Sequence, residues 1–306
     1  GAWALTYGMA GFGIALALPF TLFAIFPQWL QSLPKSGGWL DTVKKVLAFL
    51  ELALAFKFLS NADLVQHWGL LKREVFLGLW ALISIGLALY LWGKLRLPHD
   101  TKGAKISIGR KIGGVLAISF ATLLIVGIFP KNAGYIKFLS GFPPPVSNSL
   151  FSTASDNNNG LHPNLVNNYE MALQLAKEQN KPILIDFTGW ACVNCRRMEE
   201  KVWTNKEVDS IMRKEFIVLS LYVDERTKFP ATEQTVFKTS SGADKNIVTV
   251  GDKWATFQTE NFGATSQPQY VILNPNGKLL TKTKFYTPNP DEFASWLKCG
   301  LGEMKK

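Results

Sequence analysis

Cysteine and histidine are both scarce in this chain of 306 residues, with three of each. Cys192 and Cys195 are the single close cysteine pair, so the chain cannot build the disulfide framework that stabilises small secreted domains. A zinc site would need two further ligands beside that pair. The other candidate ligands do not follow zinc-finger spacing: Cys299, His67, His99 and His162. The sequence therefore predicts no metal site.

Acidic residues are fewer than basic ones, 23 against 33, which gives a formal net charge of +10. This excess suits a nucleic-acid-binding protein, but no aromatic–basic recognition module is present. The basic residues fall mainly between apolar runs and across the C-terminal part, so we expect no nucleic acid partner. The chain also opens at Gly1 inside an apolar segment, as expected of a piece of a longer protein.

The first half of the chain has long stretches with little or no charge. Four apolar runs follow one another: Trp3–Phe26, Val46–Leu59, Val75–Trp92 and Ile112–Phe129. Crossing about 30 Å of hydrocarbon takes roughly 20 apolar residues. The pattern predicts an all-α transmembrane helical bundle of four spans over residues 1–135. Two charges lie inside a predicted span, and we expect Glu51 to face the bundle interior and Lys57, near a helix end, to extend to the interface.

Basic residues in the connecting loops predict how the bundle is oriented. The connections after the first and third runs are rich in them: Lys35, Lys44, Lys45, Lys94, Arg96, Lys102, Lys105, Arg110 and Lys111. The connection after the second run is nearly balanced in charge. Because cytoplasmic loops carry the excess of Lys and Arg, the first and third loops are expected in the cytoplasm. Everything after Pro130 is then extracytoplasmic.

Residues 136–163 are rich in Pro, Asn and Ser and predict a linker. Pro143, Pro144 and Pro145 favour an extended, semi-rigid spacer, and the Asn/Ser part is expected to be mobile.

Residues 164–306 have the composition of a soluble domain and predict an α/β fold. Helices are expected at Tyr169–Glu178, Lys206–Lys214, Asp252–Asn261 and Pro290–Leu301, and strands at Ile183–Phe187, Phe216–Val223, Tyr270–Leu273 and Lys278–Tyr286. Phe216–Val223 is expected to alternate in burial, Asp224–Asn246 to be a loop, and Asn276-Gly277 to turn a hairpin. Cys299 is interpreted as a core residue. The order of elements is that of thioredoxin-like domains.

The cysteine pair stands where a buried strand meets a helix. Cys192-Val193-Asn194-Cys195 follows the strand Ile183–Phe187 and precedes a run of good helix formers. This places Cys192 at a helix N-terminus, where free backbone N–H groups favour the reactive thiolate. Cys195, one turn further on, is placed to resolve a mixed disulfide. A purely structural disulfide closing so short a loop would stabilise little.

Several stretches resemble the thiol:disulfide interchange protein DsbD family. In the first half these are LALPFTLFAIFPQWLQSLPKSGGWLDTVKK, FLSNADLVQHWGLLKREVF and GKLRLPHD. In the second half they are NKPILIDFTGWACVNCRRME, GDKWATFQTENF and SQPQYVIL. The resemblance implies a protein of the bacterial inner membrane with a periplasmic thioredoxin-like domain. Electrons would pass from cytoplasmic thioredoxin through the membrane domain to periplasmic thiol–disulfide proteins, namely disulfide isomerases and cytochrome c maturation factors. The cysteine pair would serve without any further cofactor.

The resemblance also implies roles for single residues. Cys192 matches the nucleophile, Cys195 the resolving thiol and Asp186 the buried acid that assists proton transfer. Pro268, preceded by Gln267, matches the cis-proline that lies against the cysteine pair and pairs with a partner's backbone. The partner would also meet the rim of the site: Trp190, Val193 and Asn194.

The chain departs from the family pattern in four ways, of which one is that the segment Asp224–Asn261 is longer than in a minimal thioredoxin. It has no cysteine before Cys192, although the family's membrane cysteines should lie in the first and fourth of eight spans, and its first run resembles the fifth. Ala191 stands where thioredoxins usually have Trp. Asn194 replaces the usual small residue or proline.

Two other functions use the same residues. A membrane-tethered thiol oxidase or isomerase would need only the opposite electron flow, which the reduction potential decides. A membrane anchor that handles a metal or heme would need binding but no chemistry at the cysteines.

Overall fold

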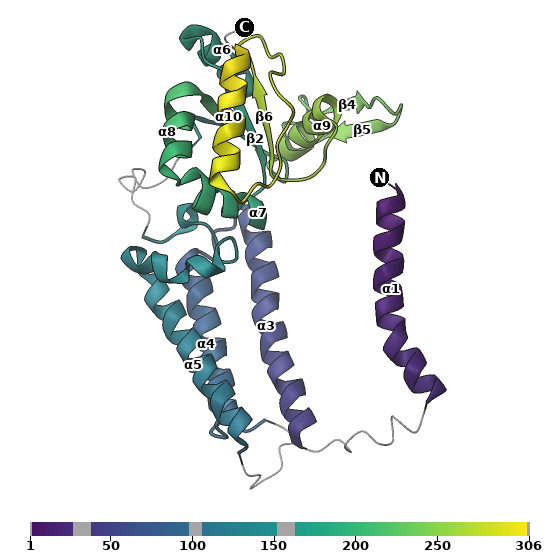
Figure 1. The fold of residues 1–306 in the computed structure, drawn as a ribbon, viewed down its shortest axis with the longest axis vertical. Helices are drawn as coiled ribbons and strands as arrows, with labels where there is room; N and C mark the ends of the chain where they lie inside the picture. The colour runs from purple at the N-terminus through teal and green to yellow at the C-terminus, as the bar shows by residue number, and fades with distance from the viewer. Residues whose placement is uncertain (1, 27–37, 98–105, 152–162, 305–306) are drawn as a thin grey trace. The chain divides into compact units, whose positions relative to one another are not determined.

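The computed structural model describes residues 2–26, 38–97, 106–151 and 163–304 (Figure 1). It divides into two compact units. One comprises Gly1–Glu51 and Gly86–Val115, and the other Leu52–Ile85 and Leu116–Lys306. The predicted domain boundaries at residues 135 and 163 stay a prediction.

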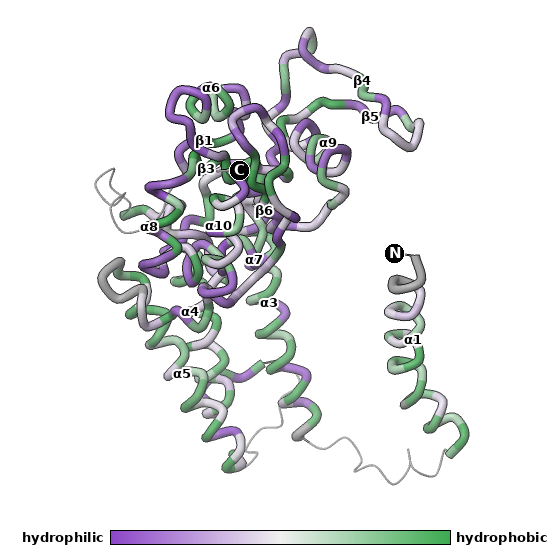
Figure 2. The backbone as a smooth tube through the Cα atoms, turned by 45° about the horizontal axis from the view of Figure 1, so that its top comes forward, coloured by the Kyte–Doolittle hydropathy of each residue, from purple (hydrophilic) through white to green (hydrophobic). Residues whose placement is uncertain are grey.

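Each apolar run of the first half forms a helix, namely α1 (Ala2–Ile25), α3 (Gly38–Gln66), α4 (Arg73–Leu91) and α5 (Ile108–Ile128). Among the described residues, two helices, α4 and α5, are long and apolar enough to cross a membrane, and both are coloured mainly as hydrophobic in Figure 2. α1 contributes a shorter apolar stretch, Thr6–Leu22. α3 is long enough but not apolar enough to be counted with them, because charged side chains recur along it. A bundle of four spans is therefore not confirmed.

The expectations for two charged residues of α3, Lys57 and Glu51, are both wrong. The helix continues to Gln66, so Lys57 does not lie near its end. The Lys57 side chain is 7% exposed, with Nζ 5.3 Å from the centroid of the Phe142 ring. Glu51 is exposed rather than turned to the bundle interior. The predicted span stopped at Leu59 because polar residues follow it, but helix propensity carries α3 onward.

In the first unit, residues of α3 and α5 contact Tyr90 of α4. The Phe49 ring lies 6.2 Å from it, measured between ring centroids. Arg110 donates to the Tyr90 carbonyl at 2.8 Å while its guanidinium lies 5.2 Å from the ring. The Lys45 ammonium lies 5.8 Å from the same ring, so two cations face one aromatic side chain.

In the second unit, the chain after α5 returns against α4. The 3₁₀-helix η1 (Pro130–Leu139) buries Ile136 on Phe76, Leu77 and Ala81 of α4 and Leu124 of α5. A second 3₁₀-helix, η2 (Val146–Asn148), follows the three prolines.

Two charged residues at the start of α4 hold the first part of the predicted linker. Arg73 donates to the Pro144 carbonyl at 2.7 Å. Glu74 accepts from the Ser149 hydroxyl and from the Leu150 N–H, the latter at 2.7 Å. The Asn/Ser-rich remainder, for which mobility was predicted, lies outside the described residues.

The thioredoxin-like part is built on a four-stranded sheet of order β1-β3-β2-β6. Its strands are β1 (Leu165–Val166), β2 (Ile183–Thr188), β3 (Ile217–Tyr222) and β6 (Gln269–Leu273). β1 and β2 pair parallel to β3, and β6 pairs antiparallel to β2. Every residue of β2 and β3 is buried, because helices cover both faces of the sheet. The alternation expected for β3 is therefore wrong.

Helices α8 (Lys206–Glu215) and α10 (Pro290–Met304) cover one face, and α6 (Tyr169–Gln179) and α9 (Val250–Phe262) the other. On the first face Leu184, Val218 and Ile272 of the sheet meet Met212 and Phe293. All four predicted helices of this part are confirmed, and Asn205 caps α8 by accepting the N–H groups of Glu207 and Val208.

Three details of this part differ from the expectation. The predicted loop Asp224–Asn246 contains a two-stranded ribbon, β4 (Thr235–Lys238) with β5 (Asp244–Ile247). The segment after the Asn276-Gly277 turn joins β6 only through isolated bridges at Lys284 and Leu279. Cys299 is exposed on α10, so its placement in the core is wrong.

Candidate active site

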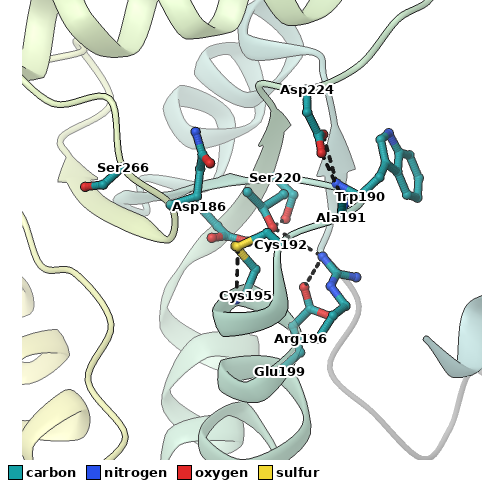
Figure 3. The surroundings of a disulfide bond; sticks show 12 residues. Asp186, Trp190, Ala191, Cys192, Cys195, Arg196, Glu199, Ser220, Asp224 and Ser266 are labelled. Carbon is teal, nitrogen blue, oxygen red and sulfur yellow. Dashed lines mark hydrogen bonds and ion pairs between the residues drawn. A yellow bond between two sulfur atoms is a disulfide. The ribbon is translucent and has the colours of Figure 1, made fainter. Parts of the chain in front are cut away.

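Cys192 and Cys195 form a disulfide with their Cα atoms 5.3 Å apart (Figure 3). Cys192 is the N-cap of α7 (Val193–Arg197), and its Sγ accepts the backbone N–H of Cys195 at 3.1 Å. α7 continues directly into the π-helix η4 (Met198–Trp203), a geometry often found at functional sites. The predicted order of strand, turn, C-x-x-C and helix is confirmed. A donor on Sγ and the helix N-terminus both favour a thiolate at Cys192.

The two sulfurs differ in access. Cys195 is 1% exposed, whereas Cys192 is of intermediate exposure. Cys192 is therefore the more accessible of the two cysteines. The predicted roles of Cys192 as nucleophile and Cys195 as resolving thiol agree with this difference and stay a prediction.

Asp224 fixes the turn between β2 and the cysteine pair. Its carboxylate accepts the N–H of Trp190 at 2.8 Å and that of Ala191 at 3.1 Å. A Cβ on Gly189 would lie 2.8 Å from Asp224 Oδ2, so a larger residue there would require the Asp224 carboxylate to shift. Sequence reasoning missed Asp224. Its signal was its position, because the carboxyl ends of the parallel strands β2 and β3 meet at one edge of the sheet.

Replacing Asp224 by alanine should leave two backbone N–H groups of the turn without their acceptor. Unpaired donors of this kind cost about 1–3 kcal/mol. We expect a lower free energy of unfolding by that amount in urea denaturation, with the reaction at Cys192 slowed because its turn loosens. An unchanged stability would show that solvent replaces the carboxylate at both groups.

Asp186 lies on β2 behind the cysteine pair and is 1% exposed. Its Oδ2 accepts the Ser220 hydroxyl at 3.3 Å, and its Oδ1 has no partner among the described residues. Burial, and then the nearby Glu199 carboxylate, raise the pKa of Asp186 to about 8, while Arg196 and Ser220 oppose the shift. The acid is thus protonated near neutral pH, and its part in proton transfer stays a prediction.

Arg196 and Glu199 form an ion pair next to the disulfide. The Arg196 guanidinium, 7% exposed, donates to Glu199 at 2.8 Å and to the Thr188 hydroxyl at 3.2 Å. Desolvation raises the pKa of Glu199 to about 7 against the pull of Arg196. Sequence reasoning missed both residues. Glu199 follows Cys195 by four residues, and that helical spacing was the available signal.

The Trp190 ring stacks on the Tyr222 ring, with ring centroids 4.0 Å apart and an angle of 20° between the ring planes. Its indole N–H donates to Glu225 at 2.8 Å. Although burial alone would raise the pKa of Glu225, donors from Thr227, Trp190 and His67 lower it to about 2. His67, at the end of α3 in the same unit, lies 3.0 Å from both Glu225 oxygens and meets the Trp190 ring edge-on at 4.9 Å.

The Gln267–Pro268 peptide is cis, as expected from the resemblance. Gln269, the next residue, pairs with Phe187 at the end of β2, so the register brings Pro268 to the edge of the sheet that carries the cysteine pair. Pro268 is buried, Gln267 and Val193 are partly exposed, and Asn194 is exposed. Their role in binding a partner stays a prediction.

Among the residues that the structure describes, no group of three or more His, Cys, Asp or Glu side chains is arranged to hold a metal ion. Thioredoxin-like oxidoreductases work with their cysteine pair alone.

A thioredoxin-type sheet with a C-x-x-C disulfide at a helix N-terminus defines a thiol–disulfide oxidoreductase, and residues 169–300 match the family model of the thioredoxin-like domain. Among curated proteins, the chain is 26% identical over 217 residues to the thiol:disulfide interchange protein DsbD of Vibrio vulnificus (strain CMCP6). The aligned residues are 70% of this chain and 32% of that protein. The DsbD of Ralstonia nicotianae is 24% identical over 212 residues, or 67% and 32% of the two chains. Both confirm the resemblance.

Among solved structures, a DsbH oxidoreductase aligns with 50% of this chain and 93% of its own, with 20% sequence identity and a TM-score of 0.33. The chain spans about a third of the length of the DsbD relatives.

Proposed function

We propose that this chain is a membrane-tethered protein-disulfide reductase that delivers electrons to protein disulfides outside the cytoplasm. The observation that carries the proposal is the Cys192–Cys195 disulfide at the start of α7, in a thioredoxin-like domain joined to apolar helices. The DsbD relatives are named for thiol:disulfide interchange, and one of them aligns with 70% of this chain.

The reaction begins with the reduced pair. The Cys192 thiolate attacks one sulfur of a partner's disulfide, forms a mixed disulfide and releases the other partner sulfur as a thiolate. Cys195, once deprotonated, attacks Cys192 Sγ. The second partner sulfur then leaves as a thiolate, and the Cys192–Cys195 bond seen here forms. Two electrons pass to the partner, and two protons follow to its thiolates.

Asp186 and Glu199 accept and return protons in this scheme. Both carboxyls lie around the disulfide and have pKa values raised toward neutrality, to about 8 and about 7. An acid whose pKa lies near the working pH is suited to accept a proton and to return it. Asp186, buried like Cys195, is the acceptor for the Cys195 proton in this proposal, and it acts in its ionised form after releasing its own proton.

The helices α1, α3, α4 and α5 are proposed as four spans in the bacterial inner membrane, with the thioredoxin-like domain in the periplasm. The excess of basic residues in the loops after α1 and α4 supports this orientation. Cytoplasmic thioredoxin is the proposed source of electrons, and periplasmic thiol–disulfide proteins are the proposed acceptors. The first cysteine of this sequence is Cys192, so a dithiol outside it must reduce the pair.

The reduction potential of the full chain in detergent micelles tests the direction of flow. The protein carries Cys299→Ser, so that only the C-x-x-C pair titrates, and is equilibrated with glutathione or dithiothreitol buffers. A reductase is expected between about −200 and −270 mV. A value near about −120 mV would reject the reductase and leave a thiol oxidase. The absence of a two-electron couple would make the pair structural or metal-binding.

A further inference from the structure

The face of the thioredoxin-like domain that carries Cys192 is covered by the same chain. Beside Cys192 and Val193 lies a cavity of about 10 Å³, no larger than the space for one water molecule. Its other wall is formed by Gly141, Pro143 and Pro145, and by Lys57, Asn61 and Leu64 of α3. All of these residues belong to the second unit. In this arrangement little room is left beside Cys192, which is of intermediate exposure, for a protein disulfide to approach.

Gly141 contacts the C-x-x-C turn itself. Its backbone has a φ of +75°, and a Cβ placed there would lie 2.5 Å from the Val193 carbonyl oxygen and 3.1 Å from the Val193 side chain. The neighbouring Ser140 carbonyl accepts the Arg197 Nε–H at 3.4 Å. Glycine at this position therefore permits both the left-handed backbone and the close approach.

The covering segment is fixed to the helices rather than to the domain. Arg73 of α4 donates to the Pro144 carbonyl at 2.7 Å. The buried Lys57 ammonium lies 5.3 Å from the Phe142 ring. Movement of the segment away from Cys192 thus means movement of the whole domain away from the helices.

A second contact lies beside the active-site turn. His67 follows α3 in a left-handed conformation, with a φ of 56°, and reaches the Glu225 carboxylate and the Trp190 ring. Asp63 shapes this connection by accepting the N–H groups of Leu70 and Leu71. The contact with Trp190 borders the same cavity, because Trp190 also lines it.

We propose that residues 140–145 and the C-terminal part of α3 form an intramolecular cover for the active site, here named the cover. The domain exchanges between a closed state, in which the cover lies on the C-x-x-C turn, and an open state that reacts with a protein disulfide. The proposal rests on the proposed function, because the excluded partner is a protein that carries a disulfide. A partner's apparent reactivity is then scaled by the open fraction.

Gly141→Ala tests the cover, because its methyl group would collide with the Val193 carbonyl oxygen. The full chain with Cys299→Ser is reconstituted in lipid nanodiscs and reduced. Cys192 is then alkylated with N-ethylmaleimide and, separately, with a maleimide carried on a polyethylene glycol chain. The measured quantity is the ratio of the two rate constants. Changes in thiolate reactivity cancel in this ratio, so it reports access alone.

In the unsubstituted protein the small reagent should react much faster than the large one. Gly141→Ala should lower the ratio about tenfold, as expected if the closed state holds roughly nine-tenths of the molecules. The matched control is Gly242→Ala, at a φ of +86° with nothing within 4 Å of the added Cβ. It carries the same backbone strain without a collision and should keep the original ratio.

His67→Ala provides a second variant if Gly141→Ala does not fold. It removes the Glu225 and Trp190 contacts and should also lower the ratio. The proposal is overturned if Cys192, in the chain with only Cys299→Ser, shows a ratio near that of the exposed Cys299 in the unsubstituted chain. It is also overturned if neither variant changes the ratio at Cys192. A reduction potential in the reductase range together with such a result would reject the cover and leave the proposed function standing.

Discussion

A Cys195→Ser variant should hold its protein partner as a stable mixed disulfide with Cys192 and show no turnover. The substitution removes the sulfur that attacks Cys192 and releases the partner. It does not remove the donor that stabilises the nucleophile, because Cys192 Sγ accepts the backbone N–H of residue 195 and not its side chain. Attack should therefore proceed while release stops. Non-reducing gel electrophoresis with a disulfide-bearing protein would show one covalent adduct that dithiothreitol dissolves.

Two variants control this result. Cys192→Ser should form no adduct, since the remaining Cys195 is buried. The experiment is performed with Cys299→Ser, because Cys299 is an exposed free thiol that could form adducts of its own. An adduct that persists in Cys192→Ser would assign the nucleophile to Cys195 and reverse the two roles. The absence of an adduct in both variants would favour a site that binds without disulfide exchange.

The parts of the site that sequence predicts well are local. Strand β2, the C-x-x-C turn and the helix after it follow one another within about twenty residues, so propensity and spacing suffice. The cis bond before Pro268 was predicted from the family resemblance, since the sequence alone does not report the isomer. The helices α6, α8, α9 and α10 were predicted from apolar spacing and caps. In each case the signal lies inside the element.

The parts that were missed depend on contacts between distant segments. Asp224 reaches the turn at Trp190 only because β3 pairs in parallel beside β2. Lys57 was interpreted as a residue at a helix end because polar residues follow Leu59, whereas α3 continues and buries it. The ribbon of β4 and β5 is exposed and polar, so no apolar alternation marked it. Cys299 was placed in the core because its residue type is usually buried.

The second large effect is expected for Asp186→Asn, which should raise the stability of the domain and lower its turnover. Asp186→Asn should stabilise the thioredoxin-like domain at alkaline pH by about 2–4 kcal/mol. The native carboxyl keeps its proton up to about pH 8, whereas an unfolded aspartate loses it near 3.8. Between these values the native state binds one proton more than the unfolded state, so stability falls as pH rises. A neutral amide removes this loss. Urea denaturation of residues 163–304, oxidised, at about pH 4 and about pH 9 measures it.

The two proteins should differ little at the acidic end, because Asp186 is neutral in the native state there, and diverge as the pH rises. Asp291→Asn, the same change at an exposed site on α10, should stay within about 0.5 kcal/mol of the original at both pH values.

The turnover of Asp186→Asn should fall by about 100-fold although its stability rises, because the amide cannot take the Cys195 proton. A variant that gained stability and kept full turnover would leave Asp186 without a part in proton transfer. The role would then pass to Glu199, which lies on η4 directly after α7, is paired with Arg196 and has a pKa of about 7.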